Sequence, residues 1–406
     1  MTESAPATVW NAPELHTLIG GLVALWLGTT ICRRVPLLGR LDIPTPVVGG
    51  VLMSLLTAAI YAVWGIEIVF ATELRDLLLL VFFVTIGLSA KLSALRAGGR
   101  PLAVLCAVTV LLLVAQNATG VLVAMAYGNH PFLGLLMGSI SFVGGPGTAL
   151  AWAKEAQAMG LARAPELALA AATLAVVVGA LVAGPITGWL VRRRGLHGTP
   201  GSTIAWVETP PTPAEAMAPV EQTMRAFLLI FLAVATGDWL NDWAQRVGLI
   251  LPGFLTAMLA GVAITNLADA FGRRLAFDPI ERNGEMALQV FLAISLMSLQ
   301  LWTVGDAVPA LLTNVVAQIA ITSAVALLVL FPLLGRDYDA AIATGGFLGF
   351  GLSSMPVAMA TMDQVTSRFG PSPRAFLLIT LAGSFFVDLA NALTVKLFLA
   401  LPLFRP

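Results

Sequence analysis

A run of helix-breaking residues stands inside an apolar segment of this chain. Residues 144–147 read Gly-Gly-Pro-Gly, and the residues around them are mostly hydrophobic. Glycine is about 1 kcal/mol, and proline about 3 kcal/mol, less favourable than alanine in a helix interior. We therefore predict a broken helix whose free amides, beside the positive end of the next half-helix, bind a carboxylate. The predicted ligand contacts are Ser141, Gly144, Gly145, Gly147 and Thr148.

A second set of helix breakers lies at the corresponding place in the second half, in residues 345–360. Pro356 suits the first turn of a half-helix, and hydroxyls before it can bind a ligand or cap the helix. Paired interruptions at matching positions of two halves point to a transporter's binding site. The predicted contacts here are Gly351, Ser353 and Ser354. The alternative interpretation is structural, with a glycine seam at the first break and simple capping at the second.

An acidic residue in the last apolar segment is a candidate ion ligand. Asp388 lies four residues after Ser384 and three before Asn391, so the three share one helix face. A carboxylate inside a membrane is costly and is a functional candidate by default. We predict that these residues bind a cation. The alternatives are a bond to a substrate ammonium, a structural hydrogen bond and a salt bridge to Lys396.

The composition identifies a membrane protein that spans the bilayer several times. The chain has 406 residues, of which 58% are hydrophobic and 11% charged, whereas soluble domains carry about 25% charged residues. Acidic and basic residues balance at 22 each, which argues against a nucleic-acid partner. The sequence contains no His-Glu-x-x-His, Gly-x-Ser-x-Gly or phosphate-binding Gly-Lys-Ser/Thr motif. We predict transport driven by an ion gradient, with no enzyme activity and no bound cofactor.

Each half of the chain contains six apolar segments. Residues 1–191 form the first half, 192–223 a polar linker and 224–406 the second half. A span needs about 20 residues. The predicted segments are 15–31, 46–64, 74–90, 101–127, 131–152 and 165–191, then 224–240, 249–267, 285–302, 308–333, 340–361 and 374–401.

The distribution of basic residues decides which segments cross the membrane. If 131–152 and 340–361 are re-entrant hairpins, five segments cross in each half, and most Lys and Arg residues face the cytoplasm. Both termini then lie outside and the linker lies inside. Because five is odd, the second half enters from the opposite side. We therefore predict an all-α protein with ten transmembrane helices in two inverted repeats, whose hairpin tips meet near the midplane.

Three stretches carry a resemblance to a known family. Gly144 to Ala149, Gly-Gly-Pro-Gly-Thr-Ala, resembles the Gly-Gly-x-Gly-Thr-Ala motif of bacterial sodium/glutamate symporters. The stretches 362–373 and 385–393 are similar to the C-terminal signature of that family. The resemblance implies a homodimer in the cell (inner) membrane that couples glutamate uptake to Na⁺. The related citrate and malate symporters share this plan, and in them a mobile domain moves like an elevator against a dimeric scaffold.

The sequence departs from the family pattern at Pro146, Ser353 and Met355. The second motif was expected to read Gly-Leu-Gly-Ala-Thr-Pro, and here it reads Gly-Leu-Ser-Ser-Met-Pro. A site built around a polar group discriminates against ligands that lack its partner. The predicted substrate is therefore glutamate or a similar acidic amino acid. The alternatives are a citrate- or malate-like carboxylate carried with Na⁺ or H⁺, and a passive anion channel.

Overall fold

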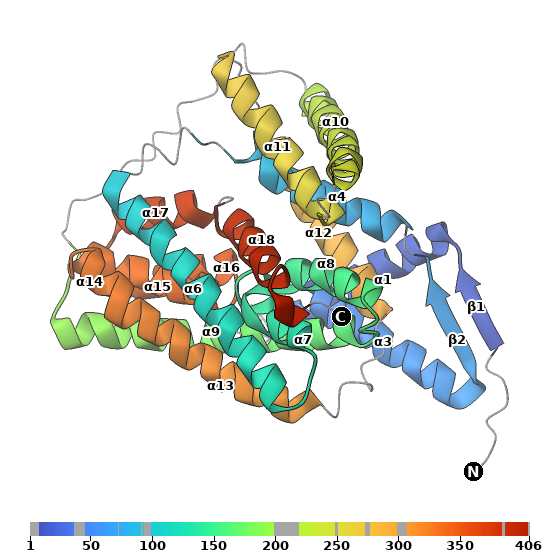
Figure 1. The fold of residues 1–406 in the computed structure, drawn as a ribbon, viewed down its shortest axis with the longest axis horizontal. Helices are drawn as coiled ribbons and strands as arrows, with labels where there is room; N and C mark the ends of the chain where they lie inside the picture. The colour runs from blue at the N-terminus through green and yellow to red at the C-terminus, as the bar shows by residue number, and fades with distance from the viewer. Residues whose placement is uncertain are drawn as a thin grey trace.

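The computed structural model describes most of the chain. The described residues are 8–35, 45–71, 73–90, 92, 99–198, 219–247, 251–272, 277–298, 307–383 and 386–404. Most of the predicted linker 192–223 lies outside them. The described chain is helical throughout, as predicted, except for one short pair of strands (Figure 1).

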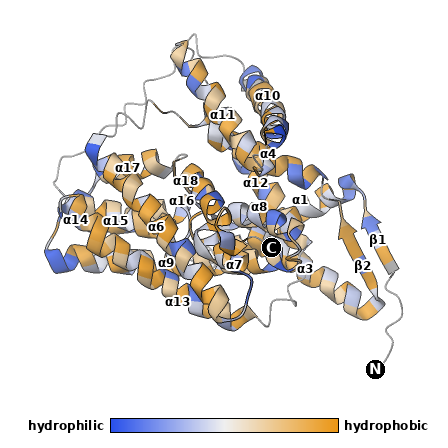
Figure 2. Ribbon diagram, in the orientation of Figure 1, coloured by the Kyte–Doolittle hydropathy of each residue, from blue (hydrophilic) through white to orange (hydrophobic). Residues whose placement is uncertain are grey.

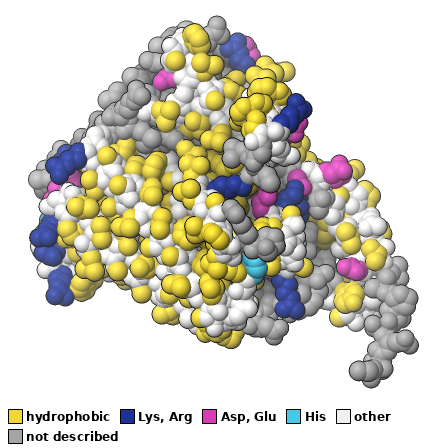
Figure 3. Space-filling view, viewed as in Figure 1, with side chains coloured by type: hydrophobic (Ala, Val, Ile, Leu, Met, Phe, Trp, Pro, Cys, Tyr) yellow, Lys and Arg dark blue, Asp and Glu magenta, His cyan; other side chains and the backbone are white. Residues whose placement is uncertain are grey.

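Long apolar helices dominate the structure, and their side chains give the molecule an apolar surface. Seven helices within the described ranges are long and apolar enough to span a membrane, or eight if the bent pair α17 and α18 counts as one span. Hydrophobic residues run along most helices in Figure 2. Hydrophobic side chains also cover most of the face in Figure 3, where Lys and Arg gather at the left margin. This surface suits a hydrocarbon environment.

Six helices form one packing group, which we call the frame group. Helices α1, α3 and α4 come from the first half of the chain, and α10, α11 and α12 from the second; they pack mainly against one another. In Figure 1 this group occupies the upper and right parts of the molecule. The bounds are Glu14–Arg34 (α1), Thr45–Trp64 (α3), Glu73–Leu88 (α4), Pro219–Arg246 (α10), Gly253–Ala270 (α11) and Phe277–Met297 (α12).

The other helices form a second group, which we call the hairpin group because it contains both predicted hairpins. Its long helices α6 and α13 pack against each other, and α9 packs against α8, α15 and α16. The bounds are Gly99–Ala126 (α6), Pro131–Leu135 (α7), Leu136–Ile140 (η1, π-helical), Gly145–Ala158 (α8), Ala164–Arg194 (α9), Val308–Ala324 (α13), Val325–Leu330 (η4, π-helical), Phe331–Leu333 (α14), Tyr338–Leu352 (α15), Met355–Phe369 (α16), Pro373–Gly383 (α17), Phe386–Leu399 (α18) and Pro402–Phe404 (η5).

Two short strands were not predicted from the sequence. Strand β1 (Thr8–Ala12) pairs in parallel with β2 (Ile66–Phe70), with Thr8 opposite Ile66. The pair lies beside α1 and α3 at the edge of the frame group (Figure 1). It ties the start of the chain to the end of α3. Isolated two-stranded ribbons are only marginally stable, so this one depends on the helices next to it.

Aromatic side chains join the two groups. Trp152 of α8 is 1% exposed, and its ring lies 5.4 Å from the ring of Phe254 of α11, edge to face. Phe83 of α4 also packs against Phe254, with 4.6 Å between ring centroids and 37° between the ring planes. Such pairs contribute about 0.5–1.5 kcal/mol beyond the area they bury. Where these rings meet, the contact between the two groups is apolar.

Within the frame group, α4 and α11 approach so closely that only glycine fits between them. A Cβ on Gly261 would lie 2.7 Å from the Val84 carbonyl oxygen and 2.9 Å from the Leu88 nitrogen. A Cβ on Gly253, the first residue of α11, would meet only Asn241, at 3.9 Å. Small residues at such seams are what lets membrane helices pack. The two glycines of α11 therefore make a matched pair for testing the seam.

We expect Gly261→Ala to destabilise the protein by about 1–3 kcal/mol, because the added methyl group pushes against backbone atoms that cannot move aside. Gly253→Ala should have little effect. The measurement is thermal unfolding of the purified protein in detergent, followed by size-exclusion chromatography. Equal melting temperatures for the two variants would show that the α4–α11 contact is looser than it looks.

Candidate functional site

The first predicted break is present and is buried in the hairpin group. The chain leaves α7, passes through the π-helical turn η1, and loses helical geometry at Gly138 (φ −91°, ψ −136°). Gly145 then adopts φ +66°, a conformation that costs other residues about 1–2 kcal/mol, and begins α8. Pro146 occupies the first turn of α8, where its missing N–H costs nothing. The Gly-Gly-Pro-Gly run therefore reverses the chain and starts a new helix.

The second predicted break lies between α15 and α16. Ser353 has φ −155° and ψ −80°, Ser354 is extended, and α16 starts at Met355 with Pro356 in its first turn. Asp337 caps the other end of α15 by accepting a hydrogen bond of 2.7 Å from the amide of Ala340. Ser353 is fully buried and Ser354 is half-buried. This break is thus a two-residue linker between opposed helix ends.

The two breaks meet although they lie in different halves of the chain. A Cβ on Gly145 would lie 3.9 Å from the Ser353 carbonyl oxygen and 4.0 Å from the Ser354 Cβ. Gly179 of α9 packs against the side chain of Ser353, since a Cβ on Gly179 would lie 2.6 Å from the Ser353 Cβ. The structure therefore brings together Gly145, Ser353 and Ser354 from the predicted site. At their meeting point lie the start of α8, the Ser353 carbonyl and the Ser354 side chain, and the Ser353 hydroxyl lies 3.5 Å from that of Ser354.

Other predicted contact residues face different directions. The Ser141 hydroxyl points at the carbonyls of Leu136 (2.5 Å) and Ala168 (3.1 Å). A Cβ on Gly147 would lie 2.9 Å from Leu288 of α12, so Gly147 faces the frame group.

Gly144 and Thr148 lie against each other, and a Cβ on Gly144 would overlap the Thr148 side chain. Thr148 is 5% exposed. Gly351 faces α6 and α13, where a Cβ would meet Leu112 and Thr322. These residues shape the break, whereas Gly145, Ser353 and Ser354 form its contact surface.

Of the predicted ion ligands, Asn391 contacts the first hairpin. Ser384 lies outside the described residues, and Asp388 is half-buried in the first turn of α18. Among the described residues none donates a hydrogen bond to Asp388. Asn391 is fully buried, and its amide nitrogen donates to the Ser139 carbonyl at 3.2 Å. The face of α18 that carries these residues therefore points toward the kink at Gly138.

Ser139 is the centre of a polar cluster that is one hydrogen short. Its hydroxyl lies 2.6 Å from Asn391 Oδ1 and 2.9 Å from Asn117 Oδ1, yet it has one hydrogen to donate. The Asn117 orientation is fixed because Oδ1 also accepts from the Ser139 amide at 3.1 Å. Reversing the Asn391 amide would only move the conflict, by placing its oxygen against the Ser139 carbonyl. In either orientation two buried oxygens face each other without a hydrogen.

The neighbouring residue of α6 contacts the other hairpin. Gln116 Nε2 donates to the Gly351 carbonyl at 2.6 Å and to Thr322 Oγ at 3.0 Å. Gln318 of α13 donates to the Gln116 carbonyl at 2.9 Å, and the side-chain oxygens of both glutamines have no partner within the described residues. Asn314 completes the cluster by donating to the Met137 carbonyl at 2.6 Å. Helix α6 thus holds one hairpin with Gln116 and the other with Asn117.

The sequence pointed to part of this cluster. Gln116, Asn117 and Gln318 stand out as amides in apolar helices. Ser139, Asn314 and Thr322 gave no such signal, because a serine, threonine or asparagine in a membrane helix usually bonds locally or joins helices. Only their long-range partners reveal that they face the two breaks.

Comparison with known proteins identifies the family of this chain. The family model described as Sodium/glutamate symporter matches residues 12–371. The chain belongs to the sodium/glutamate symporter family. It is 36% identical to the sodium/glutamate symporter of Escherichia coli strain K12 over 98% of this chain and 100% of that protein. It is 35% identical to the protein of that name from Haemophilus influenzae over 94% of this chain and 96% of that one.

Among solved structures, a sodium proton antiporter from Methanocaldococcus jannaschii superposes with a TM-score of 0.43 at 14% identity. The superposition covers 97% of this chain and 100% of the antiporter. The family assignment itself comes from sequence. It places the chain among transporters and not among enzymes, and its residues 12–371 include both breaks.

The two amides on α6 predict separate effects on the two hairpins. Gln116→Leu should raise hydrogen exchange in residues 349–356, because it leaves the buried Gly351 carbonyl without its donor, a loss of about 1–3 kcal/mol. Asn117→Leu should raise exchange in residues 137–145 instead. The measurement is hydrogen–deuterium exchange by mass spectrometry in detergent. If each variant raised hydrogen exchange equally in both hairpins, the assignment of Gln116 to the second hairpin and Asn117 to the first would be wrong.

Proposed function

We propose that this protein imports glutamate or a similar acidic amino acid by symport with Na⁺. The contact of Gly145 with Ser353 and Ser354 carries the proposal. Two broken helices meet inside the protein there, and non-helical backbone at membrane depth is tolerated where it is buried or lines a cavity. Membership of the sodium/glutamate symporter family, whose named relatives match over nearly their whole length, supports this substrate and this ion.

The substrate carboxylates bind at the meeting point of the two breaks. The first amides of α8 have no partners in their own helix, and the helix dipole favours an anion beside them. Ser353 and Ser354 add hydroxyl donors from the opposite side. Gly144, Gly147, Thr148, Ser141 and Gly351 keep the two chain reversals in shape. A bound carboxylate thus receives hydrogen bonds from both hairpins at once.

Na⁺ binds at the cluster around Ser139. A hard cation takes oxygen ligands, including side-chain amide oxygens. Bound between Asn391, Asn117 and Ser139, it would remove the shortage of one hydrogen, and the carboxylate of Asp388 adds negative charge on the same helix face. Because Ser139 belongs to η1, occupation of this site fixes the kink at Gly138 and with it the start of α8. Ion binding and substrate binding are coupled through this short stretch of backbone.

The proposal keeps the topology and the movement predicted from the sequence. Ten transmembrane helices form two inverted repeats, each with a re-entrant hairpin, and both termini lie outside a bacterial inner membrane. The α4 and α12 helices supply the third span of each repeat, although α4 has 16 residues and α12 begins with charged ones. The hairpin group moves as an elevator against the frame group, which forms a homodimer. The apolar contact through Trp152 and Phe254 suits such sliding.

We expect an inward Na⁺ gradient to drive accumulation of labelled glutamate in proteoliposomes. Unlabelled aspartate-like amino acids should compete, and citrate and malate should compete much less. Gly145→Val should abolish uptake, because its branched side chain strains the turn and enters the space before Ser353. The control is Gly160→Val. Gly160 also has positive φ (+89°), but it lies in an exposed turn with nothing within 4 Å of an added Cβ.

Three results would contradict the proposal in different ways. Competition by citrate alone would assign a tricarboxylate substrate, and flux that ignores the gradient would indicate a channel. Loss of uptake in both Gly145→Val and Gly160→Val would show that backbone strain causes the effect. The loss in Gly145→Val would then give no support for substrate binding where the two breaks meet.

The shortage of one hydrogen predicts opposite effects with and without Na⁺. Ser139→Ala removes one of the crowded oxygens, so the melting temperature without Na⁺ should rise or stay constant. The gain in melting temperature given by Na⁺ should shrink, because ligand stabilisation scales with affinity. Asn391→Ala should likewise reduce the increase in melting temperature that Na⁺ causes. Thermal unfolding in choline chloride gives the melting temperature without Na⁺, and the difference in sodium chloride gives the stabilisation by Na⁺. If either variant kept the full stabilisation by Na⁺, the ion site would not be at this cluster.

A further inference from the structure

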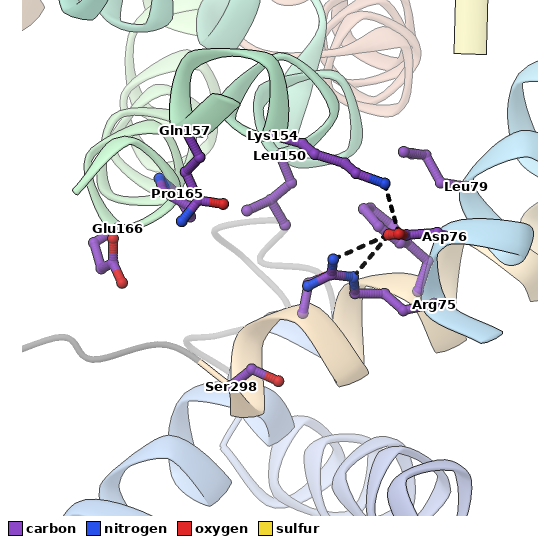
Figure 4. Close-up of a pocket in the computed structure, with 11 residues that line it drawn as sticks. Arg75, Asp76, Leu79, Leu150, Lys154, Gln157, Pro165, Glu166 and Ser298 are labelled. Carbon is purple, nitrogen blue, oxygen red and sulfur yellow. Dashed lines mark hydrogen bonds and ion pairs between the residues drawn. The ribbon is translucent and has the colours of Figure 1, made fainter. Parts of the chain in front are cut away.

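A second polar cavity lies between the two groups, away from the hairpin tips. Its volume is about 130 Å³. Figure 4 shows Arg75 and Asp76 of α4 on one side and Glu166 of α9 on the other, with Lys154 of α8 reaching in toward Asp76. Ser295 of α12 and Ser298, which follows its last residue, complete the wall. The frame group and the hairpin group thus each supply part of this cavity.

Two cations share one carboxylate in this cavity. Lys154 Nζ lies 2.6 Å from Asp76 Oδ2, and the Arg75 guanidinium lies 3.0 Å from Asp76 Oδ1. Together these three side chains carry one net positive charge, which Glu166 on the opposite wall balances. The Lys154 side chain is 54% exposed, and exposed ion pairs contribute little stability, about 0–1 kcal/mol. An incoming carboxylate can therefore replace Asp76 as the partner of Lys154 at small cost.

A buried hydroxyl in the same wall has no partner within the described residues. Ser295 is 5% exposed, and its Oγ makes no hydrogen bond there although it lines the cavity. An unsatisfied buried hydroxyl costs about 1–3 kcal/mol. A polar ligand in the cavity would satisfy it. This observation is independent of the charged residues and points to the same ligand chemistry.

The cavity also explains an exception in the charge distribution. In the proposed topology Arg75 and Lys154 belong to the few basic residues that face outside, against the usual bias. Helix α8 leads from this cavity to the hairpin tips, since Lys154 lies nine residues after Gly145 on the same helix. At about 1.5 Å per residue, this places the cavity about 14 Å from the first break. It lies on the way in from outside.

We propose that this cavity is an outer capture site for a carboxylate of the transported substrate, held by Lys154 and Arg75 before it reaches the hairpin tips. The proposal rests on the proposed import function. The side-chain hydroxyl of Ser295 donates to the same ligand, and Glu166 on the opposite wall suits the ammonium end of an amino acid. Asp76 competes with the substrate for the two cations and is displaced when the substrate enters.

The test compares two variants that break the same ion pair. Lys154→Met removes a cation, and Asp76→Asn leaves both cations free. Initial rates of glutamate uptake into proteoliposomes, at a fixed Na⁺ gradient, give KM and Vmax. Lys154→Met should raise KM about fivefold, the size expected for a half-exposed charge-assisted hydrogen bond, with Vmax nearly unchanged. Asp76→Asn should lower KM, and Lys154→Arg should keep it near the original value.

The opposite signs separate capture from a structural role of the ion pair. If the pair only fastened the two groups together, Lys154→Met and Asp76→Asn would change Vmax alike, and that result overturns the capture site. Unchanged KM in Lys154→Met also overturns it. These comparisons are made relative to the unaltered protein. If that protein transports another carboxylate, the same comparison with that compound still decides the capture site, whereas absence of any driven uptake contradicts the proposed function itself.

Discussion

Peptide groups that leave a helix inside a membrane need other hydrogen-bond partners, and this requirement organises the hairpin group. The chain leaves its helices at Gly145 and at Ser353, both fully buried. Polar side chains must therefore be brought to the same depth, and α6 and α13 supply them as Gln116, Asn117 and Gln318. The result is a polar centre inside a group of apolar helices. The frame group contains no such break in its described helices, so its seams are closed by glycines such as Gly261.

This arrangement ties the two hairpins to one another. Gln116 and Asn117 are adjacent on α6, so they point to different sides of one helix and reach the second and the first hairpin respectively. A displacement of one hairpin along α6 would break buried hydrogen bonds on both sides of it. Movement of the whole group past the frame group breaks mainly apolar contacts and the exposed pair between Lys154 and Asp76. The energetic difference favours rigid movement of the group over separate movement of each hairpin.

The sequence predicted the features that depend on local chemistry. Both breaks occur where glycine, serine and proline interrupt apolar runs, because the cost of these residues in a helix is local. The helices beside them extend beyond the predicted segments 131–152 and 340–361, to Ala158 and Phe369, since polar residues continue a helix once its other face is packed. The partners of Ser139 and the contact of Gly147 with the frame group were not predictable, because they depend on which helix lies opposite. The β1–β2 pair has the same explanation: neither strand is stable until the frame helices hold both.

The departures from the family pattern at Met355 and Ser353 differ in how they affect the contact between the two breaks. Met355 replaces a residue expected to carry a hydroxyl, but its side chain packs toward α17, where a Cβ on Gly383 would overlap its sulfur. That hydroxyl would therefore also have pointed at α17, away from Gly145, if it followed the same direction from the backbone. Ser353 is different. Its carbonyl lies beside Gly145, and its side chain fits only because residue 179 has no Cβ. The substitution at 353 therefore adds a side chain on the face of the second break that packs against α9, and Gly179 makes room for it. Any difference in substrate preference within the family should follow residues 353 and 179 together, since a larger residue at 179 would push the second hairpin toward the first.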